Sequence, residues 1–492
     1  MKTKKIFVKI VSIALAAIMA FAVTGCKPKT NDKGEITISD DNPRKDDLGD
    51  DVYVSVLDLG FGTAWVNAAA EAYKAKTGIN VYVTGDSDLS GTVATKMGTN
   101  SVKDDLYFSA FTTQNMNRWT RNNLLVPIDD VLSESVYGTS ATSRVADPYF
   151  LKLGKVGDKT YSTPYIYANW GMIYNEELLG KIESRGEYTK GEFPKTMRGL
   201  VDLCAAVKDA NLTNERTGHT VSPFSCGLGV LYMDNLFYTL WYQLDPEGWH
   251  KFFDQNNAAS FDRTTFDNDA TRTAMEWVYE LMGPVDNAHN NMVGNSQNHT
   301  ESQTSFVNGD CVFTFCGTWF ETEMKTTLDQ VGMTSYRYTA YPVIDSADAE
   351  ANKKYSQPNL PGESFFIPSD AANVAGAKDF LSFIMSEEGV AAASEAISQP
   401  VCYTSDKTIE MTRFGNDIAA AVNSSEKLYR FSENDVFKTG ACTLFQSQTN
   451  PFSAMAACSV SGTKSEIAAE LVTREADALA NNWTTYTRVL DD

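Results

Sequence analysis

The sequence predicts an α/β protein whose sheets are mainly parallel and covered by helices. The first observation is the almost continuously apolar, β-rich run at 51–57, which is typical of a buried parallel strand. The second is the succession of a glycine turn, a helix with apolar residues at helical spacing over 64–76, and a strand at 79–83. A strand, a helix and a strand in this order indicate a β-α-β unit and hence a parallel sheet.

The alternation of strand and helix continues along the chain. Residues 105–109 are expected to form a third strand, and Thr196 is placed to cap a helix with an apolar stripe. Asp267-Asn268-Asp269 precedes another expected helix, and a last one covers 467–479. No internal repeat is visible, so the pattern favours α/β lobes over a repeat array.

The amino terminus carries a targeting segment. Four lysines without an acidic residue precede the apolar run 11–22, a pattern typical of a secretory signal and too short for a membrane span. Val23-Thr24-Gly25-Cys26 resembles the lipobox of bacterial lipoproteins, in which the first mature cysteine receives diacylglycerol and palmitate. The resemblance implies a signal peptide at 1–25, lipidated Cys26, and anchoring to the outer face of the bacterial cell membrane. The alternative is a plain cleaved signal with an incidental cysteine.

Composition and charge narrow the possible partners. The 492 residues carry a net charge of −21, and removing the four signal lysines leaves about −25. Such a chain repels nucleic acid and anionic lipid head groups. The segment 26–50 is rich in Lys, Asp, Asn and Gly, which predicts a flexible linker before the folded part. The remaining chain is long enough for two large lobes or up to three domains.

The cysteines beyond Cys26 argue against a metal centre. Their number is odd and no C-x-x-C occurs, so we expect no zinc site and no cofactor. Buried free thiols are favoured over disulfides, although a bridge such as Cys402–Cys442 stays open. The seven are Cys204, Cys226, Cys311, Cys316, Cys402, Cys442 and Cys458.

Five segments together resemble the extracellular solute-binding proteins of bacterial ABC importers, in particular the large sugar-binding branch. They occur in the order of that family over about 330 residues, behind the lipobox. Position 197 is Met where the family usually has Trp, and the region after about Val401 matches only loosely. The segments are the strand, glycine turn and helix at 51–78, residues 159–175, residues 194–197, residues 306–320, and residues 362–368 with the helix after them.

The resemblance implies a two-lobed periplasmic-binding-protein-like fold of type II. Each lobe would be a mainly parallel sheet flanked by helices, with the ligand in the cleft between them. Lobe 1 is expected at 51–166 plus 318–385, and lobe 2 at 167–317 plus 386–492. Such a protein is a monomer that captures a sugar or oligosaccharide as the lobes close and delivers it to the permease subunits of an ABC transporter.

Candidate ligand contacts are suggested by the chemistry of sugars. Trp and Tyr rings fit the C–H face of a sugar, and carboxylates or amides pair with its hydroxyls. Loops after parallel strands and the lobe crossings are expected to supply them. Trp241 is as compatible with a core as with the cleft, Asp86 with a helix cap, and Glu363 with a solvated turn. The candidates are Phe61, Thr63, Asp86, Ser87, Phe111, Tyr167, Asn169, Trp170, Trp241, Trp319 and Glu363.

Enzyme motifs are not found, so no catalytic residue is expected. A surface glycan-active enzyme would need two facing carboxylates, whereas Glu321 and Glu323 are two positions apart and point to different sides of a helix. No histidine lies in a metalloprotease motif or near a serine elbow. The same fold with a non-sugar ligand such as a polyamine, or a surface sensor without transport, remains as an alternative.

Overall fold

The computed structural model describes residues 42–49, 51–99, 101–111, 113–227, 232–253, 255, 260–285, 288–289, 291–293, 298–344, 354–358, 363–427 and 461–488. The predicted signal peptide, Cys26, Cys442 and Cys458 lie outside these residues. Within the described part of the chain, no helix is both long and apolar enough to cross a bilayer. The lipid anchor and the Cys402–Cys442 bridge therefore stay predictions.

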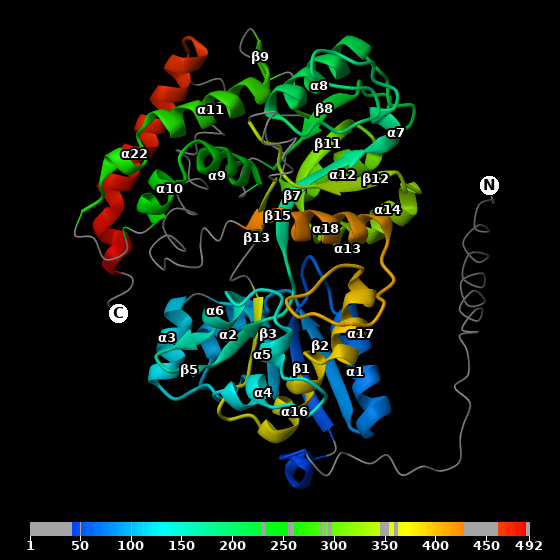
Figure 1. Cartoon of the computed structure of the whole chain (residues 1–492), viewed down its shortest axis with the longest axis vertical. Helices are drawn as coiled ribbons and strands as arrows, with labels where there is room; N and C mark the ends of the chain where they lie inside the picture. The colour runs from blue at the N-terminus through cyan, green and yellow to red at the C-terminus, as the bar shows by residue number, and fades with distance from the viewer. Residues whose placement is uncertain are drawn as a thin grey trace, which may run out of the picture. The chain divides into compact units, whose positions relative to one another are not determined.

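The first sheet has five strands in the order β2-β1-β3-β14-β6. Figure 1 labels β1, β2 and β3 of this sheet. β1 pairs in parallel with β2 and β3, as the β-α-β pattern predicted, while β14 runs antiparallel to β3 and β6. The strands are β1 (Asp51–Leu57), β2 (Asn80–Asp86), β3 (Leu106–Ala110), β6 (Ser162–Pro164) and β14 (Glu363–Phe366). We call this sheet and the helices packed on it the first lobe.

Helices cover both faces of the first sheet. On one face, Val54 and Val56 of β1 belong to the same core as Trp65 of α1 (Ala64–Thr77). On the other, Leu57 packs with α2 (Leu89–Lys96) and α3 (Thr113–Arg121). α1 ends where Gly78 adopts a φ of 78°, a left-handed conformation that glycine reaches without strain. The alternation of side chains along a strand explains why β1 feeds two apolar clusters.

The second sheet is built around β7 (Asn169–Asn175). β7 pairs antiparallel with β11 on one edge, and β12 and β13 share its other edge. The remaining strands are β8 (Ser222–Ser225), β11 (Cys311–Gly317), β12 (Tyr336–Thr339), β13 (Lys354–Pro358) and β15 (Ser425–Lys427). We call this sheet and its helices the second lobe. Its helices include α8 (Met197–Ala210), α9 (Tyr232–Leu244), α11 (Asp269–Met282) and α12 (His299–Asn308).

The chain passes between the sheets at places that differ in part from those expected. The first passage lies between β6 of the first sheet and β7 of the second. The second lies between β13 and β14, because β12 and β13 pair with β7 and so carry residues 318–358 into the second lobe. The expected boundary at 317/318 is therefore wrong.

The boundary expected at 385/386 is also wrong. α17 (Glu387–Ile397) packs on α1, and Val401 and Tyr403 bridge to Ile166 and Val145 in the first lobe. The chain reaches the second lobe only with α18 (Arg413–Ser424), which contacts β12. In both cases the sequence pattern located the element but not the sheet that it joins.

Part of the predicted linker is folded. Asn42 donates a hydrogen bond of 2.7 Å to the buried Asp379 carboxylate, and Arg44 binds Glu134 at 2.5 Å. Between them and β1, the short helix η1 (Lys45–Asp47) precedes Leu48, which is buried in the core of the first lobe. The flexible linker therefore does not extend to residue 50, because residues 42–49 pack on the first lobe.

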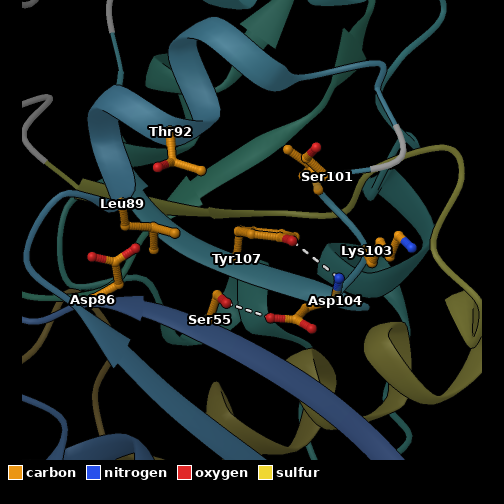
Figure 2. Close-up of a pocket in the computed structure, with 9 residues that line it drawn as sticks. Ser55, Asp86, Leu89, Thr92, Ser101, Lys103, Asp104 and Tyr107 are labelled. Carbon is orange, nitrogen blue, oxygen red and sulfur yellow. Dashed lines mark hydrogen bonds between the residues drawn. The ribbon is translucent and has the colours of Figure 1, made fainter.

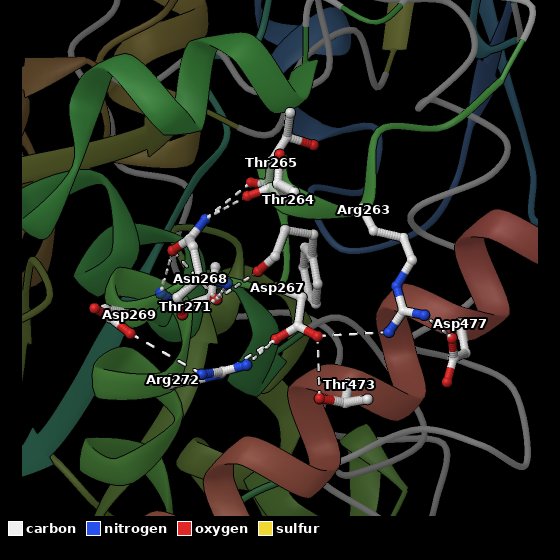
Figure 3. Close-up of polar contacts among 11 residues, drawn as sticks. Arg263, Thr264, Thr265, Asp267, Asn268, Asp269, Thr271, Arg272, Thr473 and Asp477 are labelled. Atoms are coloured by element: carbon white, nitrogen blue, oxygen red, sulfur yellow. Dashed lines mark hydrogen bonds and ion pairs between the residues drawn. The ribbon is translucent and has the colours of Figure 1, made fainter.

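The carboxyl-terminal helix α22 (Lys464–Arg488) packs on α11 of the second lobe. Figure 3 shows the polar contacts at this junction, where Asp267 pairs with Arg272 at 2.7 Å and accepts a hydrogen bond from Thr473. Arg263 joins the same junction through Asp477 at 2.6 Å. Glu475 is buried among apolar residues, and one of its carboxyl oxygens has no hydrogen-bond partner among the described residues. Burial raises the pKa of Glu475 to about 8.

Four of the described cysteines are free thiols, as the sequence predicted. Cys204, Cys226, Cys311 and Cys316 are buried free thiols, with the last two in β11, and Cys402 is buried as well. Burial raises the pKa of the Cys311 thiol to about 12, and it raises the pKa of the other three as well. Such thiols are held neutral and are poor nucleophiles.

Candidate ligand-binding site

Four aromatic side chains from both lobes meet where the lobes touch. Phe61 lies just after β1 in the first lobe, whereas Trp170, Tyr232 and Trp319 belong to the second. Trp319 lies edge-on to Trp170 at 4.6 Å between ring centroids and to Phe61 at 6.3 Å. Tyr232 completes the group at 5.0 Å from Trp170. We call these four residues the interlobe aromatic cluster.

Backbone pairing and two glycines place the Trp319 ring. Gly317 is opposite Trp170 in the β7–β11 ladder, so the chain beyond it brings Trp319 next to Trp170. A Cβ at Gly317 would lie 2.0 Å from the Trp319 ring, and one at Gly60 would lie 3.0 Å from the Trp319 Cβ. A side chain at Gly317 would therefore overlap this ring, whereas one at Gly60 would crowd it.

The cluster is tightly closed in this structure. Its four members are 6–8% exposed, so little ring surface is open to solvent. Phe61 is the only member from the first lobe. A ligand that stacks on a ring face of Trp319 therefore needs Phe61 to move away, which is a separation of the lobes at this point.

Polar groups lie beside the cluster. Gln303 of α12 donates a hydrogen bond of 2.9 Å to Glu323, and its own carbonyl oxygen is buried without a partner among the described residues. Burial raises the pKa of the Tyr232 phenol, and the Cys316 thiol and the Glu323 carboxylate raise it further. An unpaired buried acceptor costs about 1–3 kcal/mol, which a ligand hydroxyl could relieve.

Glu363 stands at the edge of the first sheet where the parallel strands end. It is opposite Ala110 at the end of β3, and it opens β14. Burial raises the pKa of its carboxyl to about 7. The rise favours the protonated carboxyl, which can donate a hydrogen bond.

The predicted residues at the ends of β1 and β2 face elsewhere. Asp86 accepts a hydrogen bond from the Asp88 backbone at 2.8 Å, and its side chain lines a pocket beside α2 rather than the interlobe cluster. Ser87 is exposed, and Thr63 is half-buried just before α1. These three residues are not brought together with the aromatic rings.

Three further candidates pack against side chains of their surroundings. Phe111 contacts the rings of Trp119 and Phe366. Tyr167 contacts the ring of Phe150. Asn169 is fully buried and donates to the hydroxyl of Tyr338 at 3.1 Å, which joins β7 to β12. Each of these side chains serves the packing around the crossing strands.

Trp241 lies in the core of the second lobe. It is 0% exposed and its ring contacts Phe252 at 5.1 Å and Phe266 at 5.6 Å. This agrees with the core alternative that its helical spacing left open.

Sequence reasoning did not find Tyr232 and Gln303. Tyr232 begins α9 just after the sequence Gly227-Leu228-Gly229, and a glycine-rich approach to a helix was the available signal. Gln303 lies within α12, and its sequence neighbours do not distinguish it from a surface glutamine.

The carboxylates near the crossing have separate partners. Glu321 accepts a hydrogen bond of 2.6 Å from Tyr336, whereas Glu323 accepts from Gln303. In the described part of the chain, no group of three or more His, Cys, Asp or Glu side chains could hold a metal ion.

A family model described as bacterial extracellular solute-binding protein matches residues 68–407. The chain belongs to this family. Among solved structures, the solute-binding protein is similar to the GacH receptor of Streptomyces glaucescens GLA.O, whose structures were determined unliganded and in complex with acarbose. The TM-score is 0.60 at 15% identity, over 90% of this chain and 98% of that one. Curated protein sequences give no significant match. The family and the neighbour confirm the two-lobed α/β fold.

Proposed function

We propose that this solute-binding protein captures a carbohydrate between its lobes and presents it to an ABC permease while a lipid on Cys26 anchors it to the membrane. The observation that carries the proposal is the interlobe aromatic cluster. Phe61 and Trp319 form a contact between lobes that consists of aromatic rings, which are the side chains best suited to the C–H face of a sugar.

Opening of the lobes would expose what a sugar needs. Separation of Phe61 from Trp319 frees ring surface, and the carbonyl of Gln303 and the carboxyls of Glu323 and Glu363 can pair with hydroxyls. A ligand that contacts both lobes favours the closed state, so ligand binding drives closure. The acarbose complex of the structural neighbour supports the same ligand class.

Several predicted residues do not enter this proposal. Trp241, Tyr167 and Asn169 are buried, Phe111 is half-buried against Trp119, and Asp86 faces a pocket of its own. The proposed contacts are Phe61, Trp170, Tyr232, Trp319, Gln303, Glu323 and Glu363.

A thermal-shift screen of the purified protein tests the ligand class. Maltose-type, cello- and xylo-oligosaccharides, polyamines and divalent metals are compared at equal concentration. A sugar present at 100 times its Kd should add about 2.7 kcal/mol to the free energy of unfolding. The matched control is the Trp170→Ala/Trp319→Ala variant, in which the sugar-dependent shift should vanish. Stabilisation by polyamines alone, or release of reducing sugar during incubation, would contradict carbohydrate capture.

The anchor is tested separately. Cys26→Ala expressed in the native host should leave ligand affinity unchanged and release the protein from the membrane fraction. Retention of the variant on the membrane, measured by fractionation and immunoblotting, would contradict lipidation at this residue.

A further inference from the structure

The outer face of the first sheet is left partly uncovered at β1 and β2. Tyr53 and Tyr82 are paired in register across these strands, and their rings stack at 5.3 Å between centroids with an interplanar angle of 23°. Each tyrosine is 49% exposed. Only two other large apolar side chains in the described chain, Leu59 and Leu244, are comparably exposed. Tyr53 and Tyr82, which we call the tyrosine pair, form the one aromatic platform among these exposed side chains.

A polar pocket adjoins the tyrosine pair. Along β1, Tyr53 and Ser55 point to the same face, about 7 Å apart by strand geometry. Ser55 lines a cavity of about 330 Å³ between the sheet and α2, together with Asp86, Thr92, Lys103 and Asp104 (Figure 2). This volume lies at the lower end of the range for small-molecule sites and suits a single sugar ring.

The polar groups on the floor of the pocket are hydrogen-bonded to one another, whereas those on its rim are available to a ligand. Ser55 donates to the Asp104 carboxylate, and the Asp104 backbone donates to the Tyr107 hydroxyl at 3.0 Å (Figure 2). Burial raises the pKa of Tyr107 to about 12, so this phenol stays neutral. By contrast, the Thr92 and Ser101 hydroxyls and the Lys103 ammonium have no hydrogen bond or ion pair with other described residues. The second carboxylate oxygen of Asp86 is likewise available.

The charges of the pocket select the class of ligand. Asp86 and Asp104 oppose an anion, and Lys103 opposes a cation, so neither phosphate nor a polyamine matches the lining. A neutral polyhydroxylated molecule suits it, because each of its hydroxyls can donate to a carboxylate and accept from an ammonium or a hydroxyl. The neighbouring tyrosine rings provide the apolar surface that the C–H face of a sugar requires.

We propose that this pocket and the tyrosine pair form a second carbohydrate-binding site, separate from the interlobe cluster. One sugar ring enters the pocket between the sheet and α2, and the adjoining ring of the same glycan lies on Tyr53 and Tyr82. The site belongs to the first lobe alone, so its occupancy does not require lobe closure. The inference rests on the proposed function in one respect only, the ligand class.

Ligand-observed saturation-transfer NMR with maltotriose, cellotriose and xylotriose tests the site in the purified Trp170→Ala/Trp319→Ala variant, in which the cleft is impaired. Saturation transfer to at least one trisaccharide should persist, with millimolar affinity. Adding Tyr53→Ala/Tyr82→Ala, or filling the pocket with Thr92→Arg, should weaken this residual binding at least about fivefold. Leu244→Ala, which removes another exposed apolar side chain elsewhere (38% exposed), should leave it unchanged.

The outcomes separate the two proposals. Binding by the wild type that disappears completely in the Trp170→Ala/Trp319→Ala variant overturns the second site and leaves the proposed function intact. Absence of binding to every trisaccharide in the wild type overturns both. If the residual binding is the same with and without the Tyr53, Tyr82 and Thr92 substitutions, the sugar binds elsewhere and the inference is also overturned. If the double tryptophan variant does not fold, the wild type is used instead, with its tighter site saturated by ligand. Saturation transfer at higher trisaccharide concentration then reports binding to the weaker site.

Discussion

The interlobe aromatic cluster and the aromatic core around Trp241 contain the same residue types but differ in origin. Among the described residues, the rings that contact Trp241 come from the second lobe, and Trp241 is 0% exposed. Trp319 contacts Phe61 of the first lobe as well as Trp170 of its own, and it retains some exposure. Aromatic density alone therefore does not separate a core from a ligand site. What distinguishes the proposed site is that its rings come from both lobes.

The largest expected effect is on the core. Trp241→Ala should lower the free energy of unfolding by about 3–5 kcal/mol, because it leaves a cavity among rings that cannot close around it. Chemical denaturation measures the loss. Trp241→Phe serves as the control and should cost considerably less. A Trp241→Ala variant of wild-type stability that no longer binds ligand would show that the comparison is wrong.

The next effect is on ligand affinity at the interlobe cluster. Trp170→Ala and Trp319→Ala should each weaken binding of the sugar found by the screen by tenfold or more, about 1.4 kcal/mol, while the protein stays folded. Titration calorimetry gives the affinity, and near-ultraviolet circular dichroism checks the fold. Normal binding by both variants would remove the cluster from the site.

The buried carboxyl of Glu475 makes the stability of the second lobe depend on pH. The folded state keeps Glu475 protonated up to pH about 8, whereas the unfolded chain releases that proton near its ordinary value of 4.5. Stability should therefore fall as pH rises between these values, because the unfolded state binds fewer protons there. Glu475→Gln stays neutral and should be more stable than the wild type at pH 9, by on the order of a few kcal/mol, and similar to it at pH 4.

This pH effect belongs to the helical layer of the second lobe and not to the ligand site. Melting temperatures of the two proteins from pH 4 to 9 test it, and ligand affinity should not differ between them. Parallel melting curves at every pH would mean that Glu475 does not carry an uncompensated charge in the folded protein.

The smallest expected effect comes from Gly60. A methyl group there would lie 3.0 Å from the Trp319 Cβ, closer than ordinary contact distance, and its backbone φ needs no glycine. Gly60→Ala should loosen the contact between lobes and weaken ligand binding a few-fold, with little loss of stability. The control is Ala64→Ser, a small change at the exposed start of α1 that should leave affinity unchanged. Gly191→Ala would not serve, because the positive φ of Gly191 would add backbone strain. Unchanged affinity would show that closure does not bring Trp319 against Gly60.

The sequence predicted the local elements of the first lobe because their signals are local. The apolar run of β1, the helical spacing of α1 and the glycine at its end each lie within a few residues. Thr196 is another such case, since its hydroxyl accepts from the Gly199 backbone as a cap. Tertiary pairing is not encoded so locally. β12 resembles many strands, and only its ladder with β7 shows that residues after Gly317 stay in the second lobe.

The candidate site was predicted in the same uneven way. Trp170, Trp319 and Phe61 were expected from their positions beside strands at the crossing, and the structure brings them together. Asp86 also lies at the end of a parallel strand, yet its side chain turns toward α2, a choice that the strand-end rule does not determine. Gln303 was not predicted because its importance depends on an unpaired oxygen within a folded core.

The segment at 42–49 has a mechanical consequence. Asn42 and Arg44 are hydrogen-bonded to Asp379 and Glu134 of the first lobe. Asn373 of the same lobe donates a hydrogen bond to the carbonyl of Leu48. Any tension that arrives along the chain ahead of residue 42 is therefore absorbed by that half of the molecule. With the proposed lipid anchor on Cys26, a pull on the chain would therefore act on the first lobe and leave the second lobe free to move relative to it.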